Sequence, residues 1–378
     1  MGVSDLFRKR KRSKSQREVT PKPPDLEPIQ EEGATLPTDS GMGTEAPPQS
    51  ASELRQPVVD KIFADLMIDE EWSVREDCGF RWWGHRLAQR VWAEPARQSR
   101  GMEVFVLHAE TSLLRNVPEG ERTQTGISIM NRFATLSGLV YDPTTGRVSL
   151  HCAAKFHEQN FTWLGRFFSL ATAMQAADAH IKVAQGIERL LGGEPDFTDH
   201  PTNGPRQNMD DMLNVLEQTV APMGKNASPF GEVDFVALES MDPSPSVMTC
   251  ADQGGVTAEF PFTGQRPAAL IPGQGQPLET ALFQATSAEA HPQLGSGCLC
   301  RLTLPVQDNT PDLACRLNGD ESTSWSASHF FGAWCNGEQG LTFITFVPAL
   351  AYQPGLLQNI FWSFAGRARW AAEWFARA

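Results

Sequence analysis

The sequence predicts an α+β protein of two tandem domains, each an antiparallel sheet covered on one face by helices, after a disordered N-terminal tail. Three observations predict this class. The order strand, short helix, hairpin and long helix occurs over residues 101–191 and again, more loosely, over 297–375, as is typical of a duplicated domain. Turn residues separate the two strands of each hairpin. Hydrophobic residues make up 40% of the chain, which is sufficient for packed cores.

The first folded segment is predicted to be a helix over residues 52–69, because four apolar side chains recur there at helical spacing: Val59, Ile62, Phe63 and Leu66. Residues 72–93 fit either a helix or strands. Gly79 and Gly84 interrupt this stretch, and side chains of alternating character follow Arg86. Two strands are therefore preferred.

The first repeat contains, in order, a strand, a short helix, a hairpin and a long helix, predicted at residues 102–108, 124–136, 139–154 and 160–191. The first of these segments is rich in β-formers and predicts a central strand. Pro143 and Gly146 favour the turn of the hairpin. Gly192 and Gly193 end the long helix, as glycines after a helix C-terminus do.

The second half is predicted from the same signals. A turn-rich linker and a helix precede it, at residues 200–206 and 209–220. Strands, a short helix, a hairpin and a final helix follow, at residues 233–238, 256–262, 280–287, 297–304, 312–318, 330–347 and 355–375. A Pro- and Gly-rich loop is predicted at 264–277. The two folded domains are expected at residues 53–222 and 230–378.

Charge divides the chain unevenly. Lys and Arg number 32 against 45 Asp and Glu, for a net charge of -13, and seven of the basic residues fall between Arg8 and Arg17. Residues 1–52 otherwise contain many Pro, Glu, Ser and Thr and little to bury, which predicts a disordered basic and Pro-rich tail. The folded domains are too acidic to bind nucleic acid. Weak contact with an anionic membrane surface is expected only of the tail.

The compartment is predicted from targeting signals and cysteines. The N-terminal charges are not followed by the apolar segment of a signal peptide, and no long uncharged apolar run predicts a membrane span. Seven cysteines, an odd number, indicate reduced thiols. We therefore expect a cytoplasmic protein.

After the N-terminal helix, four segments of the first half continue one series. They are Trp82-Trp83 with residues 87–91 in an early strand, Met130-Asn131 in the short helix, residues 138–140 in the hairpin and residues 156–158 before the long helix. This series resembles the type III secretion chaperone-like family, also called YbjN-type. The resemblance covers residues 55–220 and, more weakly, 230–376. It implies an antiparallel sheet with helices on one face, protein binding, frequent dimers and no cofactor.

Catalytic and metal-binding motifs are incomplete. His157-Glu158 begins a zinc-protease motif, but Phe161 stands where the second histidine is needed. One group of sulfur and nitrogen ligands is the best metal candidate: Cys298, Cys300, Cys315, His329 and Cys335. Its spacing matches no known zinc site, so buried thiols are the preferred interpretation. Four other histidines are scattered without a fixed carboxylate partner: His85, His108, His151 and His180. No enzyme activity, metal or cofactor is predicted.

Aromatic residues are the candidates for partner binding. The final helix carries two apolar stripes where a surface helix needs one, so we expect it to contact its own sheet and also the first domain or a second chain. We predict a non-enzymatic protein-binding or chaperone-like module that acts through apolar sheet and helix surfaces, on another protein or as a homodimer. The candidate partner-binding residues are Trp82, Trp83, Trp362, Trp370 and Trp374. The alternative is a regulatory or small-ligand-sensing protein with a ligand held between the two domains.

Overall fold

The computed structural model describes residues 50–99, 101–214, 228–239, 249–252, 254–262 and 279–377 of the chain. Residues 1–47 and 48–378 form separate units, and the fold concerns the second unit. Three predicted segments lie wholly or largely outside the described residues: the tail at 1–52, the loop at 264–277 and the part of the 209–220 helix that follows residue 214.

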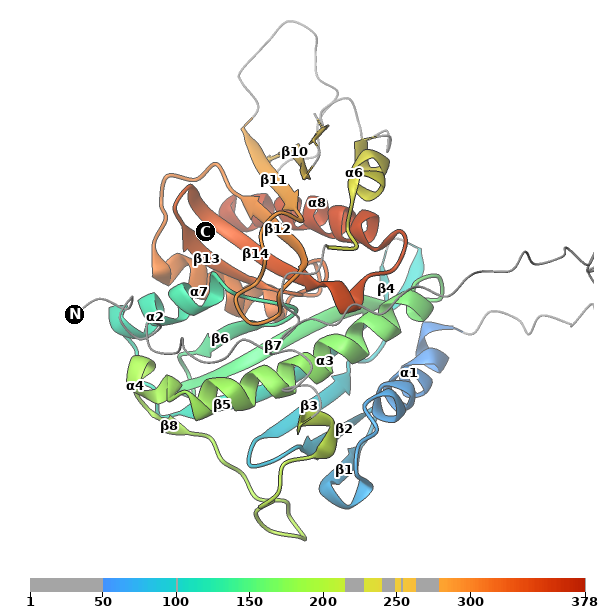
Figure 1. Ribbon diagram of the computed structural model, residues 1–378. Coiled ribbons are helices and arrows are strands. Elements are labelled where there is room, and N and C mark those ends of the chain that lie inside the picture. The colour runs from blue at the N-terminus through green and yellow to red at the C-terminus, as the bar shows by residue number, and fades with distance from the viewer. Residues whose placement is uncertain are drawn as a thin grey trace, which may run out of the picture. The chain divides into compact units, whose positions relative to one another are not determined.

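The first half forms an antiparallel sheet in the order β1-β2-β3-β5-β7-β6. Its strands are β1 (Ser73–Glu76), β2 (Gly79–Trp83), β3 (Ala88–Ala93), β5 (Met102–Arg115), β6 (Gly138–Asp142) and β7 (Arg147–Phe156). The short strands β4 (Arg97–Ser99) and β8 (Glu194–Pro195) pair with the two ends of β5. Two helices, α1 (Ala51–Asp65) and α3 (Phe161–Ala184), lie side by side on one face of this sheet (Figure 1).

The second half forms another antiparallel sheet, in the order β9-β10-β11-β12-β14-β13. Its strands are β9 (Thr249–Asp252), β10 (Gly255–Pro261), β11 (Thr280–Thr286), β12 (Gly297–Thr303), β13 (Ala333–Gly337) and β14 (Gly340–Pro348). The helices of this half are α6 (Glu232–Glu239), α7 (Pro311–Ser322) and α8 (Leu356–Phe375). The predicted fold class, α+β with one antiparallel sheet in each half, is confirmed.

The two halves share one topology. Apart from β4, β8 and the short α4 (Ile187–Leu191), each half runs helix, four strands, helix, two strands and helix, and the strand orders match. A hydrogen-bond pair also recurs. The side-chain amide of Asn131, at the end of α2 (Glu121–Asn131), bonds both the N–H and the C=O of Leu139, at 2.9 and 3.0 Å. Asn318 of α7 bonds Trp334 in the same way, at 2.7 and 2.9 Å.

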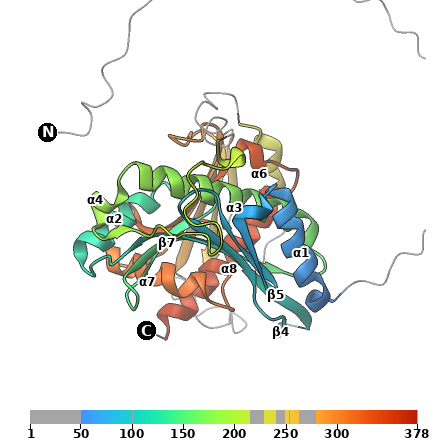
Figure 2. The same ribbon diagram turned by 90° about the horizontal axis from the view of Figure 1, so that it is seen from below.

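The halves are joined by reciprocal contacts. Helix α2 lies beside α7 (Figure 2), α2 also contacts β13, and α7 contacts β6. Ala153 of β7 exchanges two backbone hydrogen bonds with Phe330, at 2.7 and 3.0 Å. In the opposite direction, the N–H of Phe346 in β14 donates to the C=O of Ala134 at 3.1 Å. The segment before β13, in the second half, therefore bonds to the first sheet. The segment before β6, in the first half, bonds to the second sheet.

The main hydrophobic cluster contains buried side chains from both sheets. The strands meet so closely that a Cβ on Gly138 would lie 2.4 Å from the carbonyl oxygen of Gly332. The two predicted domains therefore share a core. Their predicted boundary, between residues 222 and 230, lies largely outside the described part of the chain. In that described part, no helix combines the length and apolar character that crossing a membrane requires.

Several elements of the structure differ from those predicted from the sequence. Residues 233–238 were expected to form a strand but belong to helix α6, in which Phe235 and Leu238, three positions apart, are buried. Residues 72–93 form three strands rather than two. The long helix is interrupted at Gly186, whose φ of 82° favours glycine, so that α3 and α4 are separate. Strand β5 continues to Arg115, and over residues 109–113 its buried positions alternate with half-buried ones.

Candidate functional site

Four of the five tryptophans predicted to bind a partner are buried or half-buried within the fold. Trp82 and Trp83 lie on opposite faces of β2 and are 0% and 3% exposed. Trp370 is buried, and Trp374 is half-buried and donates a hydrogen bond to Asp320 at 2.7 Å. Trp362 alone among the five is fully on the surface, with 50% of its area exposed. Of this set, Trp362 is the most exposed, and Trp374 is partly exposed.

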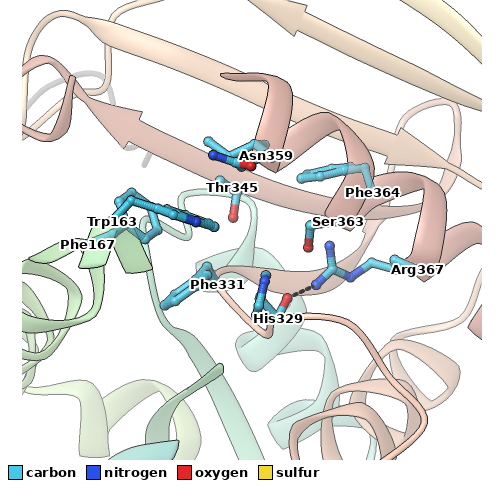
Figure 3. A pocket seen from close by; sticks show the side chains of 10 residues that line it. Trp163, Phe167, His329, Phe331, Thr345, Asn359, Ser363, Phe364 and Arg367 are labelled. Atoms are coloured by element: carbon cyan, nitrogen blue, oxygen red, sulfur yellow. Dashed lines mark hydrogen bonds between the residues drawn. The ribbon is translucent and has the colours of Figure 1, made fainter. Parts of the chain in front are cut away.

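Helix α8 packs on its own sheet and also faces the first half. Phe364 contacts Phe283 and Phe343 of the second sheet, with ring centroids 5.1 and 5.7 Å apart. The same residue lines a small cavity together with Trp163 and Phe167 of α3 (Figure 3). The expectation that this helix contacts more than its own sheet agrees with this arrangement.

The junction cavity leaves about 20 Å³ for the centre of a water molecule. That volume accommodates one or two waters and excludes an organic ligand. Figure 3 shows Arg367 directed toward the segment that carries His329, whose backbone oxygen accepts a hydrogen bond from the guanidinium. A small molecule held at this point between the halves is therefore not supported by the cavity.

Arg367 belongs to a buried ion pair. Its Nε donates to Oε1 of Glu321 at 2.7 Å, and the two side chains are 1% and 0% exposed. The other carboxylate oxygen accepts a hydrogen bond from the indole of Trp334 at 2.6 Å. The guanidinium also lies 3.5 Å above the ring of Phe343. Burial raises the pKa of Glu321 and lowers the pKa of Arg367, although each charge favours the other.

The candidate metal ligands do not converge. The sulfur atoms of Cys298 and Cys300 lie 3.9 Å apart on one face of β12, as expected for residues two apart on a strand. Cys315 instead points to a backbone oxygen of α2, and His329 accepts a hydrogen bond from the N–H of Lys155. Among the described residues, no three His, Cys, Asp or Glu side chains form a cluster that suits a metal. Burial raises the pKa of the Cys315 thiol to about 12, which keeps it protonated.

Two histidines that are far apart in the sequence form a hydrogen-bonded chain that ends at a carboxylate. His108 Nε2 lies 3.0 Å from Oε1 of Glu94, and His108 Nδ1 lies 3.2 Å from Nε2 of His151. The hydrogen bond to His108 is the main cause that lowers the pKa of Glu94. From the second half, the indole of Trp325 donates to the same carboxylate, and the ring of Phe330 contacts His151. This chain of hydrogen bonds therefore fastens a segment of the second half to the first sheet.

A larger cleft, of about 540 Å³, lies on the face of the first sheet opposite α1 and α3. Its floor includes Trp83 and Ala88, and residues 196–201 form one wall. Trp83 donates a hydrogen bond to the hydroxyl of Thr198 at 3.1 Å, which holds this wall against the sheet. The charged side chains of the cleft are Glu76, Arg81, Arg90, Glu110, Arg147, Asp196 and Asp199.

The strands β1, β2, β3 and β5 each contribute two residues at alternate positions to the cleft, and β7 contributes Arg147. Arg81 stands between the buried Phe80 and Trp82, and Arg90 between the buried Gln89 and Val91. This alternation is visible in the sequence and could have identified the face. The pairing that brings the strands together could not be read from it.

No protein-family model matches this chain. Searches of curated proteins and of solved structures likewise give no match.

Proposed function

We propose that this protein is a non-enzymatic, chaperone-like binding module whose polar cleft binds an acidic segment of a protein partner. The observation that carries the proposal is the unequal exposure of the charges in the cleft. The side chains of Arg81, Arg90 and Arg147 are 45%, 46% and 57% exposed, whereas their ion-pair partners Glu76 and Asp196 are 23% and 6% exposed. Of the other two acids in the cleft, Glu110 is half-buried and Asp199 is exposed. The exposed charges of the cleft are therefore three arginines against one aspartate, in a chain whose net charge is -13.

Arginine suits a carboxylate partner because its planar guanidinium offers several N–H donors, and two of them can bind one carboxylate. Each of the three arginines uses only some of its donors within the cleft. The cleft extends over five strands, which suits an extended segment of chain more than a compact metabolite. The apolar face of the sheet lies under α1 and α3, so this polar face is the part of the sheet that a partner reaches.

The type III secretion chaperone-like family and a cytoplasmic location belong to the same proposal. Support comes from the topology, since each half is one antiparallel sheet with helices on one face. The reciprocal pairing of the halves would then replace, within one chain, the dimer that the resemblance implies. The free thiols of the described residues, all buried except Cys78, fit a reducing compartment.

Binding to labelled peptides tests the proposal. A fluorescein-labelled polyglutamate peptide is expected to bind the full-length protein at low salt and to dissociate as salt rises. The double variant Arg81→Gln/Arg147→Gln should bind it at least about tenfold more weakly, because one charge-assisted hydrogen bond contributes roughly 1.5 kcal/mol. Fluorescence anisotropy measures both affinities.

The matched control is Arg369→Gln, which removes a similarly exposed arginine of α8 that is paired with Glu373. It should bind polyglutamate as the unaltered protein does. Equal affinity of the double variant and the unaltered protein, or a preference for polylysine, would refute the acidic-partner proposal.

A further inference from the structure

The interior of the first half contains polar side chains where the second half has apolar ones. Gln89 and Thr111 face each other across β3 and β5. The two sheets can be aligned at Leu139 and Trp334, the strand residues that Asn131 and Asn318 bind. Counted across each sheet from these two residues, the pair Gln89 and Thr111 corresponds to Phe283 and Leu302 in the second half. The two copies therefore differ in polarity at one buried point.

Gln175 of α3 completes the polar group. Its amide oxygen accepts hydrogen bonds from Gln89 at 3.0 Å and from Thr111 at 3.1 Å, and its amide nitrogen donates to the backbone oxygen of Ala109 at 2.9 Å. Gln89 also donates to the backbone oxygen of Thr172 at 2.8 Å. This network ties the helix to the middle of the sheet. It would be costly in such an interior unless every member were satisfied.

Two buried atoms beside the network have no hydrogen-bond partner among the described residues: Nε1 of Trp82 and Oε1 of Gln89. Their residues are 0% and 2% exposed and lie directly opposite each other on β2 and β3. One is a donor and the other an acceptor. Unpaired polar atoms at this depth are rare in folded proteins.

Both residues line the same small cavity, together with Thr111, His85 and His180. The cavity leaves about 10 Å³ for the centre of a water molecule, which is the space that one water needs. Burial, followed by the interaction with His180, lowers the pKa of His85, which favours the neutral form of the His85 ring at pH 7. The lining thus offers one neutral donor, one neutral acceptor and room for a single small molecule.

We propose that this cavity is a structural binding site for one water molecule, which accepts a hydrogen bond from the indole of Trp82 and donates one to the amide oxygen of Gln89. The site belongs to the first half alone, because the equivalent positions of the second half are apolar. It completes the network that fixes α3 on the sheet. A cation or an anion does not suit it, because neither of the two unpaired atoms belongs to a charged group.

A crystal structure of the full-length protein, at a resolution that shows ordered water, tests the site. A density peak should lie at hydrogen-bond distance, roughly 2.7–3.2 Å, from both Trp82 Nε1 and Gln89 Oε1. A direct hydrogen bond between these two atoms, or no peak near them, would overturn the proposal. The double variant Trp82→Phe/Gln89→Leu should lose the peak. Water-proton relaxation dispersion in solution should then count one fewer long-lived water in that variant than in the unaltered protein, and an unchanged count would contradict the site.

Discussion

Replacing Glu321 by Gln is expected to lower the free energy of unfolding by about 3–5 kcal/mol, because it leaves the charge of Arg367 buried without a counter-charge. Both members of this pair are at most 1% exposed. The guanidinium would keep its contacts with the ring of Phe343 and with the backbone oxygen of His329. Neither contact supplies a negative charge. Urea unfolding at pH 7, followed by circular dichroism, measures the change.

The same helix provides the matched control. Glu373 forms an ion pair with Arg369 at 3.0 Å, but the two side chains are 38% and 47% exposed. Glu373→Gln should therefore cost less than about 0.5 kcal/mol. Similar losses in the two variants would show that the Glu321 pair is solvated. The double variant Glu321→Leu/Arg367→Met should be much closer in stability to the unaltered protein than Glu321→Gln is, since it leaves no unpaired charge.

The protein is expected to lose stability steeply below pH 6.5, because three buried histidines sit where the halves meet. The His329 ring accepts a hydrogen bond from the N–H of Lys155 at 3.1 Å. The His291 Nε2 lies 3.2 Å from the backbone oxygen of Phe133, and the His151 ring contacts Phe330. Each contact joins one half to the other. A proton on any of these rings would place a charge in the junction.

Burial is the first cause that lowers the pKa of each of the three: to about 3 for His329, well below the usual 6.5 for His151, and below it for His291. The unfolded chain then binds more protons than the folded one as pH falls below 6.5. Stability is thus complete above pH 6.5 and declines toward acid. His329 alone should account for about 2 kcal/mol between pH 7 and pH 5.

Other charges modify this pH dependence. His329 faces Lys155, Arg367 and His157, which all disfavour its protonation. Asp178 favours a proton on His291 while Lys182 opposes it, and His108 opposes one on His151. Glu321 acts in the opposite direction to the histidines, because its raised pKa favours the folded state as pH falls.

Urea unfolding at several pH values between 7 and 5 measures the effect. The variant His329→Gln keeps a hydrogen-bond acceptor for Lys155 but does not titrate, so its stability should decline less steeply, by about 1 kcal/mol per pH unit. His157→Gln is the comparison at a half-buried histidine whose pKa burial also lowers, and it should flatten the decline less than His329→Gln does. If His329→Gln follows the same slope as the unaltered protein, His329 is not the titrating group.

The fold class could be predicted because it depends on local pattern. Tight turns, runs of β-formers and the recurring Asn131 and Asn318 are all visible in the sequence. Helix α6 was missed because the β-branched Val233 and Val236 favour a strand locally, whereas burial of Phe235 and Leu238 decides the helix. Its position matches that of α1 in the first half, so the repeat itself could have corrected the prediction.

The candidate site was less predictable. Glu94, His108 and His151 come from β3 or its end, β5 and β7, and only strand register brings them together. The tryptophans were predicted to bind a partner because they are large aromatic residues, but size does not distinguish an exposed anchor from a core residue. Trp370 illustrates this, since it is buried and donates a hydrogen bond to Ser324 at 3.2 Å.

Calorimetric unfolding of the full-length protein is the most direct test of the central claim, that two copies of one sheet-and-helix unit exchange edge segments and share a core. A shared core predicts one transition for residues 50–378, with equal calorimetric and van't Hoff enthalpies. Two resolved transitions, with the Glu321→Gln variant shifting only the one that belongs to the second half, would contradict it.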